Sequence, residues 1–467
     1  MGGGALGVDE GVPGARLTRD GLLRRQSARD SAARTYTRAL PIVPVRARGM
    51  TIEGADGRRY LDCLSGAGAL ALGHNHPVVL EAIRRVLDSG APLNALDLAT
   101  PVKDAFVTEL FSTLPPGLAD RARVRFCGPT GSDAVQTAYE LVRAATATGR
   151  TGFEAQEDAG LVRVVHPQDC HDLLPADAAV PPAGVLVEAV QGEGVLPAPD
   201  AWVRRVRQLT ADRSVPLIAD EIQTGVGRTG TFWAMEHSGV TPDVMVLSEA
   251  IGGSLPLAVV VYRDDLDTGE PGTHTGTFRG NQLAMAAGTA TLAHVRENRL
   301  AERASALGAR MLRRLRAAAQ QFACVGAVRG RGLMIGVELV DPEGAGAPSA
   351  TRGGSLPERP TVREQSLHQS AVQDAAGQDS AVQEAAAPVP AASQLAAMVQ
   401  RECLRRGLIV GLGGRHANVV RLLPPLTITD EQAAAVLDRL TDAIRAAASC
   451  PGVTARQRGG AAHRALP

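Results

Sequence analysis

Two acidic residues that follow apolar runs are the strongest candidates for chemistry in this sequence. Asp220 closes the run 215–220, and Glu249 comes directly after the run 244–248. Short continuous apolar runs separated by helical stretches indicate a parallel sheet covered on both faces. Ligands of such open sheets bind at the carboxyl ends of the strands. The sequence therefore predicts a ligand site at Asp220, with a cap on the following loop as the alternative role for this side chain.

A loop of small residues offers a place for an anion. Residues 128–133 read Gly-Pro-Thr-Gly-Ser-Asp and open a predicted helix that runs to about residue 148. Small side chains let backbone N–H groups, here those of Gly131 and Ser132, reach a phosphate, and the helix dipole favours that anion. Ser132 or Asp133 could instead cap the helix. A short glycine-containing loop is a weak motif, so the loop alone favours the cap.

The histidines and cysteines do not form a convincing metal site. His166, Cys170 and His171 lie close together, but a tetrahedral site needs a fourth ligand that the sequence does not assign. We therefore interpret this segment as a loop and predict no metal ion. His74 and His76 stand at a strand-to-helix junction, where we expect a structural role.

The elements that must position these residues form two domains. Strands are expected at 42–46 and 49–62, with a hairpin turn at Ala-Asp-Gly 55–57, and strands and helices alternate from about 77 to 298. Residues 341–392 have too few large apolar side chains to offset chain entropy. The predicted organisation is a flexible lead-in (1–30), the first part of a small domain (31–76), a large sheet domain (77–298), the second part of the small domain (299–340 and 393–450), a disordered insert (341–392) and a flexible tail (451–467).

Composition excludes several classes of function. The formal net charge is zero, which gives no global attraction to nucleic acid or to anionic membranes. No apolar run approaches the roughly 18–20 residues of a membrane span, and the first residues lack the pattern of a secretory signal. The six cysteines form no Cys-x-x-Cys pair. We therefore expect a reduced, cytoplasmic protein.

Several ordered motifs together resemble one family. The chain is similar to class III aminotransferases, which are fold type I enzymes dependent on pyridoxal phosphate (PLP), and most similar to diaminobutyrate–2-oxoglutarate aminotransferases. The resemblance implies an α/β fold with a large, mostly parallel sheet domain and a small α+β domain built from both chain ends. It covers roughly residues 24–446 apart from the insert, and the motifs that carry it lie at 60–68, 73–77, 100–103, 126–133, 218–230, 244–258, 274–282 and 415–426.

The resemblance also implies a role for each matching side chain. Asp220 would pair with the pyridine nitrogen of PLP and improve the ring as an electron sink. Arg421 would take the substrate carboxylate through a bidentate fork. The further implied roles are contacts with the phosphate from Gly131 and Ser132, packing on the ring by Ile222, a contact with the ring hydroxyl from Gln223, a contact with the neighbouring subunit's phosphate from Thr277, and neutralisation of Arg421 by Glu193.

One departure from the family falls on its central residue. The residue after Ser248 is lysine in the family, where it holds PLP as a Schiff base, and here it is Glu249. A carboxylate has no nitrogen with which to attack an aldehyde. Lys103 is the only lysine in all 467 residues, and its start-of-helix motif predicts an ordinary helix-surface residue.

A second departure concerns the wall of the site. After residue 150 the family continues into several dozen residues with an aromatic-His pair that stacks on the PLP ring. Here residues 151–158 run almost directly into the strand-like segment 161–166. Phe153 could stack instead, although nothing beside it resembles the family motif. The glycine run after Gln191 also looks one residue short, which could shift Glu193.

These features leave three hypotheses. The favoured one is a catalytically lapsed homologue, kept as a structural or regulatory partner, in a homodimer or in a heterodimer with an active paralogue. The second is a non-standard enzyme that binds an amino acid, with Glu249 as acid or base and with non-covalent PLP, pyridoxamine phosphate (PMP) or no cofactor. Near Asp220, burial and like charge would raise the pKa of Glu249. The third is retained amino transfer from diaminobutyrate to 2-oxoglutarate.

Overall fold

A computed structural model describes residues 19–29, 40–96, 98–148, 162–164, 182–269, 276–341 and 390–449. The chain folds around a six-stranded mixed sheet in the order β4-β11-β10-β9-β6-β5. These strands span Ala122–Phe126 (β4), Val259–Arg263 (β11), Val244–Leu247 (β10), Leu217–Asp220 (β9), Gly184–Glu188 (β6) and Val162–Val164 (β5). Phe153, the cluster His166, Cys170 and His171, nearly all of the predicted insert and the predicted tail lie outside the described residues.

The sheet is parallel from β10 to its edge strand β5 and antiparallel on the side of β11 and β4. β5, β6, β9 and β10 run parallel, whereas β11 pairs antiparallel with both β10 and β4. The expectation that short apolar runs form a parallel sheet therefore holds for β6, β9 and β10 and is wrong for β11. An apolar run buried on both faces looks the same in either direction, so composition alone does not fix strand polarity.

Helices cover both faces of this sheet. Leu186 and Ile218 pack with α5 (Gly131–Thr148), while their neighbours Val187 and Leu217 pack with α6 (Asp200–Asp212). This alternation follows from the two-residue period of a strand. Every residue of β10 is buried, as expected for a central strand.

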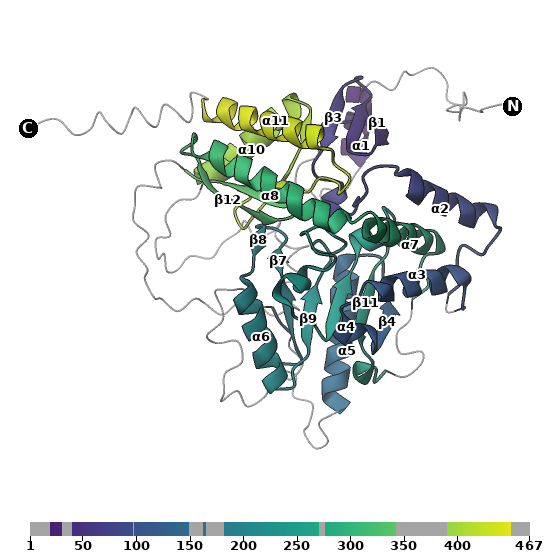
Figure 1. The fold of residues 1–467 in the computed structure, drawn as a ribbon. Coiled ribbons are helices and arrows are strands. Elements are labelled where there is room, and N and C mark those ends of the chain that lie inside the picture. The colour runs from purple at the N-terminus through teal and green to yellow at the C-terminus, as the bar shows by residue number, and fades with distance from the viewer. Residues whose placement is uncertain are drawn as a thin grey trace, which may run out of the picture.

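The strands of the small domain come from both ends of the chain (Figure 1). One sheet has the order β1-β2-β3-β14 and the other β12-β13-β16-β15, with α8, α10 and α11 packed over them. This arrangement confirms the predicted fold class. The strands span Pro44–Arg48 (β1), Thr51–Gly54 (β2), Arg59–Asp62 (β3), Leu408–Ile409 (β14), Val325–Arg331 (β12), Met334–Leu339 (β13), Val419–Leu422 (β16) and Gly411–Gly413 (β15), and the helices Leu300–Ala319 (α8), Pro390–Arg405 (α10) and Asp430–Ala448 (α11).

Local signals in the sequence place several element ends. Gly57 has φ +75° in the predicted hairpin turn between β2 and β3. This left-handed backbone conformation favours glycine. Thr429 caps α11 by accepting from the Gln432 N–H at 3.2 Å, and Gln432 accepts from the Thr429 N–H in return. The remaining elements include α1 (Arg19–Arg29), α2 (Pro77–Asp88), α3 (Pro101–Ser112), α4 (Pro116–Ala119), α7 (Gln282–Glu297), β7 (Val190–Gln191) and β8 (Leu196–Pro197).

The turn that carries Glu249 is fixed against α7 by close backbone contact. It is a single 3₁₀ turn, Glu249–Gly252, directly after β10. A Cβ on Gly288 of α7 would overlap the Ile251 carbonyl oxygen, and one on Gly253 would overlap the Ala287 carbonyl. Glycine at both positions therefore lets the turn and the helix touch.

No helix in the described ranges combines the length and the apolar character that crossing a membrane requires.

We expect Gly288→Ala to destabilise the protein by about 2–3 kcal/mol, since the added methyl group must displace the turn or the helix. Chemical denaturation of Gly288→Ala and of Ala290→Ser, a partly exposed control on the same helix, measures the difference. A loss for Gly288→Ala no larger than for the control would show that the contact is not tight.

Candidate active site

Acidic residues at or just beyond the ends of three adjacent strands lie at the carboxyl edge of the sheet. Glu188 ends β6 and lies directly opposite Asp220, which ends β9. Asp220 in turn lies opposite Val246 of β10, three residues before Glu249. Parallel neighbours place their carboxyl ends at one edge, so the fold itself gathers these carboxyl groups.

Glu249 is half-buried and lies among several charged groups. Its backbone adopts a left-handed conformation with φ 55°, which is uncommon for a residue with a side chain. Its Oε2 atom is buried and has no hydrogen-bond partner among the described residues. Burial and the neighbouring Asp220 raise the pKa of Glu249 to about 7, and Arg228 and Arg421 partly oppose this shift. The predicted rise in the pKa of Glu249 therefore has both expected causes.

The pKa values of the two neighbouring carboxyl groups, Asp220 and Glu188, are also raised. Burial raises the pKa of Asp220 to about 6, although its Oδ1 accepts from the Ile222 N–H at 3.0 Å. Burial and Asp220 raise the pKa of Glu188 to about 8, while the Gly192 N–H, 2.7 Å from Oε2, lowers it. Perturbed carboxyl groups at a sheet edge are typical of functional sites.

Arg228 supplies positive charge beside this group. Its side chain is 2% exposed, and its Nη1 donates to the carbonyl oxygens of Pro424 and Leu333. Burial lowers its pKa to about 10, and Glu249 raises it. Nη2 has no hydrogen-bond partner within the part of the chain that the structure describes. The buried guanidinium therefore depends on the charge of Glu249 for part of its compensation.

The predicted phosphate loop lies beside the residues that follow Asp220. A Cβ on Gly131 would lie 3.0 Å from Cδ1 of Ile222. The helix is capped reciprocally: Thr130 Oγ1 accepts from the Asp133 N–H at 3.2 Å, and Asp133 Oδ2 accepts from the Thr130 N–H at 3.1 Å. Ser132 is exposed, with its Oγ 3.0 Å from Thr130 Oγ1. The predicted alternative in which Asp133 caps the helix is therefore correct. Its partner Thr130 was not identified from the sequence.

Gln223 and Gly192 approach each other closely at the same edge. The Oε1 atom of Gln223 is buried without a hydrogen-bond partner in the described segments. A Cβ on Gly192 would lie 2.6 Å from it. Glycine at 192 thus leaves room for the Gln223 amide.

Arg421 and the 192–193 segment are also brought together. Arg421 lies in β16 and is 9% exposed, and its Nη1 donates to the Gly192 carbonyl at 2.9 Å. The carbonyl of Glu193 accepts from the Gly414 N–H at 2.8 Å, and the Glu193 side chain is exposed. The structure therefore positions the backbone of 192–193 against the β15–β16 hairpin.

The structure places Thr277 on the surface and Lys103 in the first turn of a helix. Thr277 is exposed, and its carbonyl oxygen accepts from Asn94 Nδ2 at 3.4 Å. Lys103 lies in the first turn of α3, where its N–H donates to Thr100 Oγ1, and its ammonium lies 5.3 Å from the centroid of the Phe126 ring. The predicted start of the helix is correct, but the lysine is half-buried over an aromatic ring.

Sequence reasoning missed Glu188 and Arg228. Glu188 ends an apolar strand in the same way as Asp220, and that pattern could have identified it. His74 was assigned a structural role, which agrees with its bond from Nε2 to Asp62 Oδ2 at 2.8 Å. Among the described residues, no group of three or more His, Cys, Asp or Glu side chains could hold a metal ion.

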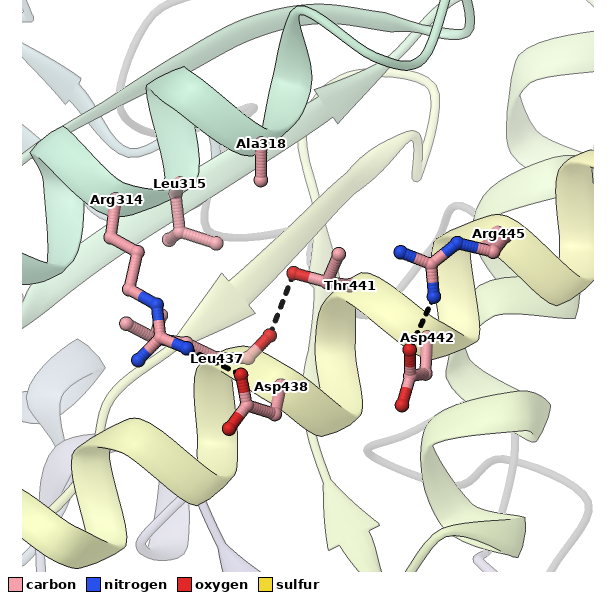
Figure 2. A pocket seen from close by; sticks show the side chains of 8 residues that line it. All are labelled: Arg314, Leu315, Ala318, Leu437, Asp438, Thr441, Asp442 and Arg445. Atoms are coloured by element: carbon pink, nitrogen blue, oxygen red, sulfur yellow. Dashed lines mark hydrogen bonds and ion pairs between the residues drawn. The ribbon is translucent and has the colours of Figure 1, made fainter.

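A separate groove of about 260 Å³ lies between α8 and α11 (Figure 2). Arg314 pairs with Asp438 across it, and Arg445 pairs with Asp442 along α11. Because these charged groups neutralise one another, the groove offers little for a ligand. Its lining residues are Arg314, Leu315, Ala318, Leu437, Asp438, Thr441, Asp442 and Arg445.

Comparison with known proteins defines the family. The chain matches the family model of class III aminotransferases over residues 31–159 and 167–444, and it belongs to this family. It is 44% identical to a diaminobutyrate–2-oxoglutarate aminotransferase of Rhizobium meliloti (strain 1021), over 94% of this chain and 95% of that protein. A protein of the same description from Haemophilus influenzae is 35% identical, over 91% and 94% of the two chains.

Solved structures share the fold. An acetylornithine aminotransferase from Elizabethkingia anophelis superposes with a TM-score of 0.71 at 24% identity, covering 92% of this chain and 99% of that one. An ornithine aminotransferase from Plasmodium yoelii has the same TM-score at 23% identity, with 92% and 100% covered.

The described residues fit the ring and the phosphate of PLP but not its covalent attachment. Asp220, the buried Gln223 oxygen and the small residues opening α5 are the groups that would hold the cofactor. When bound, PLP acts as an electron sink for amino acid chemistry. The resemblance described above implies that the side chain at the attachment position is the Glu249 carboxyl group, which has no nitrogen with which to make that bond.

We expect Glu188→Gln to stabilise the protein at high pH. The pKa of Glu188 in the folded state is about 8, above the ordinary 4.5. Folding therefore favours the protonated side chain, and the stability that this form contributes is lost as the pH rises from about 4.5 toward 8. Glutamine keeps an acceptor for the Gly192 N–H and does not ionise. The unfolding temperature should rise by about 2 °C or more near pH 8.5 and change little near pH 5. An equal gain at both pH values would contradict the shift.

Proposed function

We propose that this class III aminotransferase homologue does not carry out standard PLP-dependent amino transfer and serves as a structural or regulatory protein. The observation that carries the proposal is Glu249, a carboxyl group beside Asp220 at the position where the family has its lysine. Without an amine there, PLP or PMP can be held only non-covalently. An incoming amino group then has no imine between enzyme and cofactor with which to exchange.

The cation balance of the site supports this proposal. A lysine at 249 would face Arg228, whose buried guanidinium Nη2 has no hydrogen-bond partner in the described chain. Glutamate instead provides a compensating charge, since Glu249 raises the pKa of Arg228. Lys103, which would have to supply the missing amine, lies over Phe126.

A second candidate function is a non-standard enzyme in which Glu249 acts as acid or base on an amino acid. The buried Oε2 of Glu249 and its pKa of about 7 favour it, because a group with a pKa near the working pH exchanges protons efficiently. Asp220 and Arg421 would hold the cofactor ring and the substrate carboxylate. Unchanged activity in Glu249→Ala would exclude this candidate.

We also propose that the chain forms a homodimer, with a heterodimer with an active paralogue as the alternative. Large apolar side chains are exposed near Thr277: Phe278 is 76% exposed and Leu96 is 60% exposed. Asn94, which bonds to the Thr277 carbonyl, connects the two segments. Exposed apolar surface of this kind is typical of an interface, and Thr277 beside it would reach the neighbour's phosphate site.

Transamination is tested with PLP, diaminobutyrate and 2-oxoglutarate, with glutamate as the product. We expect no turnover above background and no PLP fixed to the protein by borohydride, in the wild type and in the matched control Lys103→Arg alike. Glu249→Lys supplies the missing amine and is expected to fix PLP. Borohydride-stable PLP on wild-type residue 103, or sustained glutamate formation by the wild type, would overturn the proposal.

Self-association is tested with Phe278→Arg. A charged side chain in the apolar patch should raise the dissociation constant of the dimer by about tenfold or more. Light scattering over a concentration series measures it, with Val45→Arg as the control, since Val45 is 55% exposed on β1. A monomeric wild type, or equal weakening by both variants, would argue against this interface.

A further inference from the structure

We propose that Glu249 makes this site selective for the aminomethyl form of the cofactor, PMP, over the aldehyde form, PLP. The proposal rests on the proposed function, because only a site without covalent attachment can select the cofactor form by charge. It assigns to Glu249 a ligand, the ammonium group of PMP, and a role in specificity.

The first step concerns the group that faces residue 249. In the family, the side chain at this position bonds to the aldehyde carbon of PLP, so the substituent on that carbon lies next to residue 249. In PMP this substituent is a protonated amine, which donates hydrogen bonds, whereas in PLP it is a neutral aldehyde, which does not. A carboxylate accepts from the ammonium group and gains nothing from the aldehyde.

The second step concerns the state of the Glu249 carboxyl group. Its Oε2 atom is buried and without a hydrogen-bond partner in the described ranges. A buried oxygen of this kind loses its bonds to water and gains when a donor arrives. The nearest atom to a Cβ built on Gly68, at 3.7 Å, is this same Oε2, so a glycine backbone with φ 108° borders the carboxyl group and leaves space beside it.

The third step concerns competing cations. The charged groups that face Glu249 are Asp220 from β9, Arg228 from the loop after β9, and Arg421 from β16. Arg228 donates to the carbonyls of Pro424 and Leu333, and Arg421 donates to the carbonyl of Gly192. The Nη1 atoms of both guanidiniums thus donate to backbone oxygens, while Oε2 of Glu249 has no hydrogen-bond partner among the described residues and can accept from a ligand.

The fourth step concerns the combined negative charge of the carboxyl groups at the sheet edge. Glu188, Asp220 and Glu249 bring three carboxyl groups together, and burial is the main cause of the raised pKa of each. A cationic group placed among them favours their ionised forms, while a neutral aldehyde does not. Charge and hydrogen bonding therefore favour the same ligand.

The test is calorimetric titration of the full-length protein with PMP, PLP and pyridoxine 5′-phosphate. The last carries a neutral hydroxymethyl group at the same carbon and, unlike PLP, cannot react with Lys103. We expect PMP to bind about tenfold or more tightly than either of the others, which is the gain typical of a hydrogen bond between charged groups. In Glu249→Gln, which keeps the shape and removes the charge, the preference should shrink to about twofold or less.

Three outcomes would overturn the proposal: equal or tighter binding of PLP, the same PMP preference in Glu249→Gln, or no binding of any of the three. If Glu249→Gln does not fold, the wild type is titrated at about pH 8.5 and about pH 5.5. The pKa of Glu249 lies between them, so the ratio of PMP to pyridoxine 5′-phosphate affinity must fall at the lower pH. A constant ratio would count against Glu249. Transamination by the wild type would refute the proposed function and leave this binding comparison to be judged separately.

Discussion

The burial of several carboxyl groups at the ends of adjacent strands is the constraint on which the site depends. Glu188 and Asp220 face each other across β6 and β9, and Glu249 begins the turn after β10. Moving ionised groups from water into such a place is costly, so their pKa values rise. The site must therefore gain protons, use the two nearby guanidiniums, or bind a cation to become stable at neutral pH.

The fold makes this cluster unavoidable. Parallel β6, β9 and β10 end at one edge, and the turn at 249–252 is pressed onto α7 through Gly253 and Gly288. The β15–β16 hairpin brings Arg421 to the Gly192 carbonyl. The backbone at 249 is thus held near Asp220, and the charge of the side chain at 249 acts directly on this carboxyl group.

Much of the fold could be predicted from the sequence, because apolar runs, caps and hairpin turns are local signals. The cap at Thr429 and the turn at 55–57 are examples. The antiparallel direction of β11 could not be predicted, since strand polarity is set by neighbours that lie far away in the chain. The position of Arg228 in the site could not be predicted for the same reason, because its partners Leu333 and Pro424 are over a hundred residues away in the chain.

Only part of the candidate site was predicted from the sequence, and the electrostatic interactions of Glu249 with the arginines were not. Motifs identified Asp220 and Glu249 singly, whereas the opposition of Arg228 and Arg421 to the pKa shift of Glu249 appears only when the chain is folded. A lysine at 249 would add a third cation beside the two arginines, and glutamate reverses that charge. On the proposal made above, an anion at this position, among carboxyl groups with raised pKa values, would favour an amine ligand over an aldehyde. The proposed exchange at 249 would then change the chemical preference of the pocket as well as remove the covalent bond.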